Sequence, residues 1–151
     1  LPSNLHTLYV PTLSNATSTY RVEQALTAAM IRELRNRTNY RIITKDPNGE
    51  ADATLSGVVT GTSAYPLTTG TQSENGISVT GVTSSLVTVS VQISLKDRTG
   101  RILWNNPNYV FHDQYQVALD VESFFEESGP ALQRIATDFS RTLVSDMLEA
   151  Y

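Results

Sequence analysis

The stretch Ser85–Leu95 reads SLVTVSVQISL and decides the fold, because its side chains alternate strictly in character. The odd positions from 87 to 95 all carry branched aliphatic groups, and the even positions from 88 to 94 carry hydroxyl or amide groups. Successive side chains of a β-strand point to opposite faces of the sheet, so this strand has one apolar and one polar face. We expect the apolar face to cover a core and the polar face to meet water or a partner.

A second strand is predicted directly after this one. The polar segment 96–101 contains Gly100, a residue type that adopts positive φ readily, and is typical of a hairpin turn. Beyond it, Ile102–Asn105 and Tyr109–His112 carry the apolar and aromatic side chains of a strand that Pro107 interrupts. The sequence therefore predicts a long antiparallel hairpin, and the other segments extend its sheet or cover its apolar face.

Two helices and several shorter strands are predicted around this hairpin. Apolar residues recur at helical spacing over about 20–37 and again from Pro130 to Glu149. A loop rich in Ser, Thr and Asn precedes the first helix and offers several N-caps. The remaining strands are predicted at 5–11, 40–44 and 53–63. This order predicts a single domain over residues 1–151 of the α+β class, with two helices packed on one face of a mainly antiparallel four- to five-stranded sheet.

Residues 65–84 form a long polar segment in which Glu74 is the only charged residue. Two arrangements are open for it: a mobile hairpin tip, or a continuation of both neighbouring strands outward from the sheet. In the strand before it, Gly57 and Gly61 fall on one side, which predicts close packing or a bulge.

The composition argues against several classes of protein. The chain has 15 acidic and 11 basic residues, a net charge of −4 and a pI near 5.1, so no nucleic-acid partner is expected. It has no cysteine, hence neither a disulfide nor a thiolate nucleophile. No apolar run approaches the roughly 20 residues that span a bilayer. The sequence starts at Leu1, without a methionine or a signal peptide. We interpret it as a mature fragment whose targeting segment lies upstream.

No catalytic, metal-binding or cofactor-binding constellation is apparent. The two histidines, His6 and His112, are far fewer than the clustered ligands that a metal site needs. His112 and Asp113 are neighbours on a predicted strand and would point to opposite faces. Glu126 and Glu127 are adjacent, and so are poorly placed to flank one bond. We therefore do not expect an enzyme, and we expect neither a metal nor a cofactor.

Six segments of the chain carry a resemblance in their order and spacing. They are Leu8–Pro11, Tyr20–Thr27, Arg37–Ile42, Ala51–Gly57, Asp97–Trp104 and Phe124–Leu132. Together they resemble the LPS-assembly lipoprotein family, LptE. The resemblance implies two helices against a largely antiparallel sheet. It also implies an outer-membrane lipoprotein on the periplasmic side, anchored through an N-terminal lipid, that plugs and helps assemble the LptD β-barrel and binds lipopolysaccharide on its way to the cell surface.

The resemblance directs attention to polar surfaces that could match a wet barrel lumen. The polar side of the Ser85–Leu95 strand and the segment 65–84 meet that requirement. The candidate contacts with the barrel partner are Tyr65, Glu74, Thr88, Ser90 and Gln92.

Candidate lipopolysaccharide contacts have to be cationic, because lipid A and the core carry phosphates. In the family, basic residues near the long hairpin and before the last helix contribute. Here no Lys or Arg lies between Lys45 and Lys96, and the segment before the last helix is acidic, so those contacts do not transfer. The candidates are instead Lys96, Arg98 and Arg101, which cluster at one turn.

An alternative stays open at this point. A generic periplasmic envelope-interaction or small-ligand-binding module with the same fold would have no barrel partner. That alternative predicts a closed apolar pocket, whereas the plug predicts a stable complex with a barrel.

Overall fold

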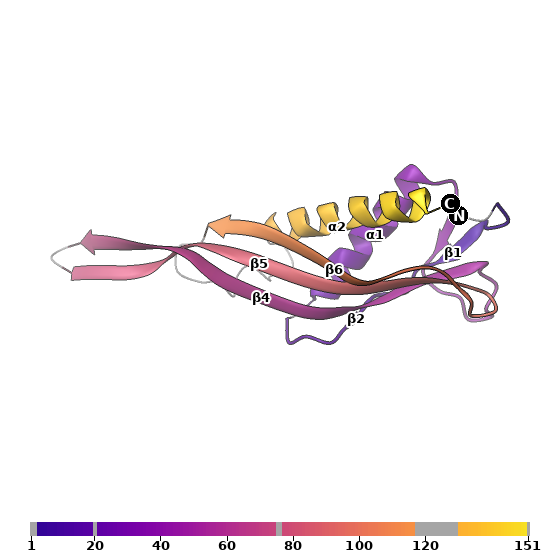
Figure 1. Ribbon diagram of the computed structural model, residues 1–151, viewed down its shortest axis with the longest axis horizontal. Coiled ribbons are helices and arrows are strands. Elements are labelled where there is room, and N and C mark those ends of the chain that lie inside the picture. The colour runs from indigo at the N-terminus through magenta and orange to yellow at the C-terminus, as the bar shows by residue number, and fades with distance from the viewer. Residues whose placement is uncertain (1–2, 20, 75–76, 117–129, 151) are drawn as a thin grey trace.

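The computed structural model describes residues 3–19, 21–74, 77–116 and 130–150. Two helices lie next to each other on one face of a β-sheet, and two of the strands extend far beyond them (Figure 1). The elements are β1 (Thr7–Tyr9), β2 (Ser14–Asn15), α1 (Val22–Arg37), β3 (Arg41–Ile43), β4 (Ala53–Glu74), β5 (Ile77–Asp97), β6 (Ile102–Gln116) and α2 (Pro130–Glu149). The prediction of an α+β fold with both helices on one face is confirmed. The acidic pair Glu126 and Glu127 lies outside the described residues.

Strand β5 is the middle one of the three long antiparallel strands, as its sequence predicts. It pairs antiparallel with β4 on one side and with β6 on the other. Its apolar residues Val87, Val89, Val91, Ile93 and Leu95 are all fully buried, and they belong to one hydrophobic core that also includes both helices. The alternation of the sequence has therefore placed these five branched side chains on the helix-covered face.

Residues 65–74 and 77–84 continue both strands outward, which is the second of the two predicted arrangements; residues 75–76 lie outside the described part of the chain. The β4–β5 pairing runs on from Tyr65 opposite Leu86 to Glu74 opposite Ile77. We call Tyr65–Glu74 with Ile77–Ser84 the β4–β5 arm. The arm points away from the end of the molecule where both termini lie (Figure 1).

The sheet is less uniformly antiparallel than predicted, and it has six strands. The strand order is β3-β1-β4-β5-β6, with β2 paired to β4 beside this path. β1 pairs in parallel with both β3 and β4, and β2 is also parallel to β4. For β1 and β3 the cause is the connection through α1, since a helical crossover lets the chain return parallel to the first strand. The segment 44–52 then carries the chain past β1, so that β4 also lies parallel to it. The antiparallel prediction holds for the three long strands only.

The loop before α1 also differs from its prediction. Ser14 and Asn15 form the short strand β2 opposite Val58 and Val59. The helix begins after Arg21, whose φ of 62° is left-handed, and not after a Ser, Thr or Asn cap. The Asn15 side chain instead donates to the carbonyl oxygen of Thr19, at 2.6 Å, and to the Glu23 carboxylate, at 3.0 Å. The capping-type residues thus stabilise the loop itself.

Both the close packing and the bulge predicted for β4 are present, but the two glycines do not fall on one side of the strand: Gly57 pairs with buried Ile93, whereas Gly61, after the bulge, pairs with half-buried Ser90. A Cβ atom at Gly57 would lie 2.3 Å from the backbone oxygen of Gln92 and 2.5 Å from Cδ1 of Ile93. The register between β4 and β5 shifts between Val59 and Gly61, as it does at a bulge. Gly57 therefore permits a close approach, and Gly61 follows an irregularity.

Helix α2 closes the core over β5 and β6. Its predicted stripe is buried throughout, with Leu132, Ile135, Ala136, Phe139, Leu143 and Met147 each at most 1% exposed. The ring of Phe139 meets those of Tyr109 and Phe111 edge to face, at centroid distances of 6.3 and 5.6 Å. The Tyr109 hydroxyl donates to the Asp146 carboxylate, which ties β6 to α2. Among the described residues, neither helix combines the length and hydropathy of a membrane-crossing segment.

Candidate functional site

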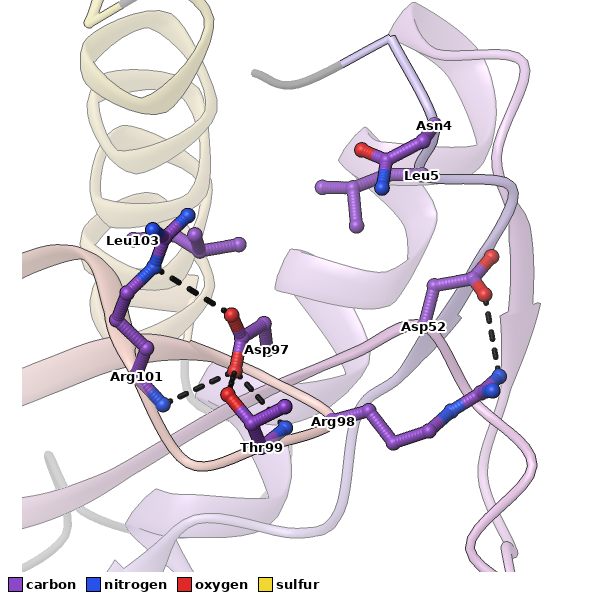
Figure 2. A pocket seen from close by; sticks show the side chains of 8 residues that line it. All are labelled: Asn4, Leu5, Asp52, Asp97, Arg98, Thr99, Arg101 and Leu103. Carbon is purple, nitrogen blue, oxygen red and sulfur yellow. Dashed lines mark hydrogen bonds and ion pairs between the residues drawn. The ribbon is translucent and has the colours of Figure 1, made fainter.

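A pocket of about 250 Å³ lies at the end of the sheet where β5 turns into β6 (Figure 2). We call it the arginine pocket. It is lined by Asn4, Leu5, Asp52, Asp97, Arg98, Thr99, Arg101 and Leu103. It contains two of the three predicted cations, Arg98 and Arg101. The third, Lys96, is exposed and is not part of the pocket lining.

Asp97 organises the turn between β5 and β6. Its Oδ1 atom accepts hydrogen bonds from the Thr99 hydroxyl at 2.6 Å and from the backbone N–H groups of Thr99 and Arg101 at 2.9 and 3.0 Å. Its Oδ2 atom lies 3.5 Å from Nε of Arg101. The bond from the Thr99 hydroxyl, followed by the backbone bonds and the Arg101 charge, lowers the pKa of Asp97. Gly100, at φ 91°, completes this turn.

Asp52 holds Arg98 against the start of the sheet. Its Oδ2 atom accepts bonds from the backbone N–H groups of Thr7 and His6, at 2.9 and 2.8 Å, and these two bonds lower the pKa of Asp52. Its Oδ1 atom lies 3.3 Å from Nη2 of Arg98. Arg98 also donates to the carbonyl oxygens of Glu50 and Ala51, at 2.9 and 3.4 Å. Arg98 therefore joins the β5–β6 turn to the segment that enters β4.

Both arginines of the pocket are thus paired with a carboxylate. Figure 2 shows Arg98 reaching toward Asp52 and Arg101 lying beside Asp97. The bonds of Arg98 occupy its Nε and Nη2 atoms, and the ion pair of Arg101 involves Nε, so further N–H donors of each guanidinium remain for a ligand. Sequence reasoning found the two cations but assigned neither Asp52 nor Asp97 to a site. Asp52 lies 46 residues from Arg98, and no local pattern signals that pairing.

The polar face of β5 lies opposite the helices. We define it as Thr88, Ser90, Gln92 and Ser94, which alternate with buried residues and are partly or fully exposed. The Thr88 hydroxyl lies 2.9 Å from Nδ1 of His112 on β6. Three of the five predicted barrel contacts, Thr88, Ser90 and Gln92, therefore share one surface.

The other two predicted barrel contacts belong to the β4–β5 arm. The backbone of Tyr65 is paired opposite Leu86, and that of Glu74 opposite Ile77 at the outer end of the arm. The structure therefore separates these two positions from the polar face along the length of β4.

The tempting acid–base pair on β6 is divided between the two faces of the sheet. Asp113 accepts from Nε of Arg134 on α2, at 2.8 Å, whereas His112 contacts Thr88 on the opposite face. The two side chains point apart, as predicted for neighbours on a strand. Within the described part of the chain, no three His, Asp or Glu side chains are grouped to hold a metal.

The comparisons with solved structures define the class of fold. The chain is similar to an uncharacterized lipoprotein B from Nitrosomonas europaea, with 15% identity over 100% of this chain and 90% of that chain and a TM-score of 0.57. It is similar to the rare lipoprotein B from Shewanella oneidensis, with 12% identity, coverages of 93% and 94% and a TM-score of 0.54. The subunit of the PelC dodecamer from Paraburkholderia phytofirmans has 17% identity, coverages of 91% and 84% and a TM-score of 0.53. At these identities the likeness shows a shared fold alone.

The family is shown by the sequence. Residues 5–147 match the model of the LptE family, described as lipopolysaccharide-assembly. The chain therefore belongs to the LptE family, whose members are assembly lipoproteins of outer-membrane biogenesis. No curated protein sequence matches the chain.

Proposed function

We propose that this chain plugs the LptD β-barrel translocon and helps it to assemble, as a single LptE-like domain over residues 1–151. The observation that carries the proposal is the family match, which covers almost the whole chain. We further propose that the protein is lipid-anchored on the periplasmic side of the outer membrane and has no catalytic activity.

The shape and surface of the molecule support the plug. A body inside a water-filled lumen gains from polar surfaces that keep their hydrogen bonds, because a desolvated unpaired charge is costly. The polar face carries hydroxyl and amide groups, and the β4–β5 arm contains Glu74 as its only charged residue. The alternative, a small-ligand-binding module, predicts a closed apolar pocket. The pockets of about 250 and 240 Å³ are both lined by charged side chains, and the apolar pocket at Leu5, Thr7, Leu8 and Tyr40 has a cavity volume of about 0 Å³, which favours the plug.

The experiment that tests the plug is a pull-down of the tagged, full-length anchored protein from its native outer membrane. We expect a large β-barrel at about equal stoichiometry that resists high salt. As a matched pair, Ser90→Arg places a charge on the polar face and Thr142→Arg places one on the exposed side of α2. The Ser90→Arg variant should recover less of the barrel in the pull-down, and the Thr142→Arg variant should recover as much as the unmodified protein. Recovery of no barrel with the unmodified protein would remove the proposal.

We also propose that lipopolysaccharide phosphates bind at Lys96, Arg98 and Arg101. The remaining N–H donors of the two arginines support it, as does Lys96, for which no ion pair exists among the described residues. Arg98 also holds the fold through Asp52, so the informative variant is Lys96→Gln with Arg101→Gln. We expect weaker and less salt-sensitive binding to lipopolysaccharide, with an unchanged melting temperature. Arg141→Gln on α2 is the control. Unchanged binding in the double variant would exclude this site.

A further inference from the structure

Strand β4 has a long free edge. On one side it pairs with β5 over its whole length, from Ala53 to Glu74. On the other side it pairs with β1 at Ala53 and Thr54, and with β2 at Val58 and Val59. From Thr60 to Glu74, no other strand of the described residues pairs with this second side. About half of the backbone N–H and C=O groups of this run face outward, because the groups of successive residues point to alternate sides of a strand.

Free edges of this kind are normally protected. Natural sheets shorten their edge strands, place Lys on them or cover them, because an open edge pairs with other chains. The run 60–74 contains no Lys or Arg, and its only charged residue is the last one, Glu74. At about 3.3 Å per residue it is roughly 50 Å long. Pro66 and the register shifts on either side of Thr68 are the only protective features of this run, since proline and bulges also blunt an edge. The stretches Gly61–Pro66 and Thr69–Glu74 keep a regular register with β5. Such an edge is better suited to pairing with another extended backbone than to facing solvent.

The edge already accepts a strand at its inner end. β2 lies along it in parallel register, and the N–H of Ala16 donates to the carbonyl oxygen of Val59 at 2.9 Å. After Ala16 the backbone pairing stops while β4 continues, and the last contact of this segment with the edge is between the hydroxyl groups of Thr19 and Thr62, 2.6 Å apart. The free edge is thus the direct extension of a surface that binds an extended backbone within the chain itself.

We infer that the free edge of β4, residues 60–74, binds an extended segment of the barrel partner by β-strand addition. This inference rests on the proposed plug function. The wall of a closed barrel has no free edge, because all of its strands are paired with one another. The occupant is therefore a loop or terminal segment folded into the lumen, without charged side chains where it lies against residues 60–73, which carry no charge. Backbone hydrogen bonds supply the affinity, so the contact depends little on side-chain identity.

The test is residue-resolved amide hydrogen exchange on the full chain, alone and in its complex with the barrel. Alone, every second amide over 60–74 exchanges fast. In the complex these amides slow by about fivefold or more, the equivalent of one net backbone hydrogen bond. The amides that face β5 do not change. A complex that forms without this protection overturns the edge inference and leaves the plug standing. Failure to form any complex overturns both. The same protection arising from self-association, without the barrel, assigns the edge to a second copy and also overturns the inference.

A pair of proline variants separates the edge from the ladder. Thr71 and Gln72 are adjacent and are paired opposite Thr80 and Val79. Proline removes one N–H group, and it is tolerated where that group faces outward from an edge strand. One of Thr71→Pro and Gln72→Pro therefore breaks the ladder with β5. The other leaves the melting temperature nearly unchanged but weakens the complex by about fivefold or more. Equal affinity of that stable variant and the unmodified chain would overturn the inference.

Discussion

Replacement of Gly57 by alanine tests how tightly β4 and β5 are packed. The added methyl group would lie 2.3 Å from the backbone oxygen of Gln92, 2.5 Å from Cδ1 of Ile93 and 3.2 Å from Cδ2 of Leu13. The Ile93 side chain can rotate, but the Gln92 oxygen belongs to the central strand and cannot move without displacing the ladder. Overpacking of this kind costs about 1–3 kcal/mol. Because the clash with the backbone cannot be avoided, we expect the cost of Gly57→Ala to lie toward the upper end of this range.

Gly61→Ala is the matched control, since the same methyl group on the same strand meets open packing. Its nearest neighbours would be Cβ and Oγ of Ser90, at 3.9 and 4.0 Å, which are ordinary contacts. Removing a glycine also restricts the unfolded chain, so this variant should gain about 0.4–1 kcal/mol. The two variants should therefore move the free energy of unfolding in opposite directions.

The assay is urea unfolding followed by circular dichroism, together with calorimetry. At about 2–4 °C per kcal/mol for a chain of this size, Gly57→Ala should lower the melting temperature by up to roughly 12 °C. The slope of unfolding against urea should stay constant in all three proteins, because a single methyl group barely changes the surface exposed. An unaltered midpoint for Gly57→Ala, or equal losses in the two variants, would refute the close approach of β4 to β5.

Three further changes test contacts that the structure places across the chain. Asp52→Asn should lower the stability at pH 7 by about 1–3 kcal/mol, because the carboxylate holds two backbone N–H groups and Arg98. The lowered pKa of Asp52 means that this contribution is present above about pH 4 and is lost as the pH falls. In a pH series of urea unfolding, the midpoint of Asp52→Asn should therefore fall less steeply on the acid side than the midpoint of the control Asp138→Asn. Tyr109→Phe should cost about 0.5–1.5 kcal/mol through the lost bond to Asp146. Burial and that bond raise the pKa of Tyr109, so its contribution is complete below about pH 10 and is lost above it; thermal melts at high pH should show less alkaline destabilisation in the variant. Arg134→Gln breaks an ion pair whose arginine side chain is 54% exposed, and calorimetry should find a loss of no more than about 1 kcal/mol.

The elements with strong periodicity could be predicted from the sequence. Val87–Leu95 alternates without exception, and the α2 stripe from Leu132 to Met147 follows the helical repeat, because one face of each is buried. The resemblance across six segments also led to the correct family. In each case the signal lies within a continuous stretch of the chain.

What the sequence did not reveal depends on pairings between distant segments. Two-residue β2 is a strand only because β4 lies beside it, and the parallel order of β1 and β3 follows from the path of α1. Asp52 and Arg98 meet because β4 begins where β5 ends, and neither residue stands out locally. For the same reason the three predicted lipopolysaccharide contacts do not all lie together: Lys96 lies on the strand outside the pocket, and Arg98 and Arg101 line the pocket.

The distribution of charge along the β4–β5 hairpin explains how one sheet could serve both parts of the proposed function. From Ala53 to Leu95 the chain carries Glu74 as its only charged residue, whereas Asp52, Asp97, Arg98 and Arg101 gather where the two strands end. A hairpin with a single charged residue enters a confined lumen at little electrostatic cost, because there are few ions to desolvate. Charges at the opposite end stay near bulk water, where their pairs are inexpensive and can be exchanged for phosphate. The antiparallel pairing keeps these ends apart by the full length of β4. The proposed plug and the proposed anion site therefore do not compete for the same surface.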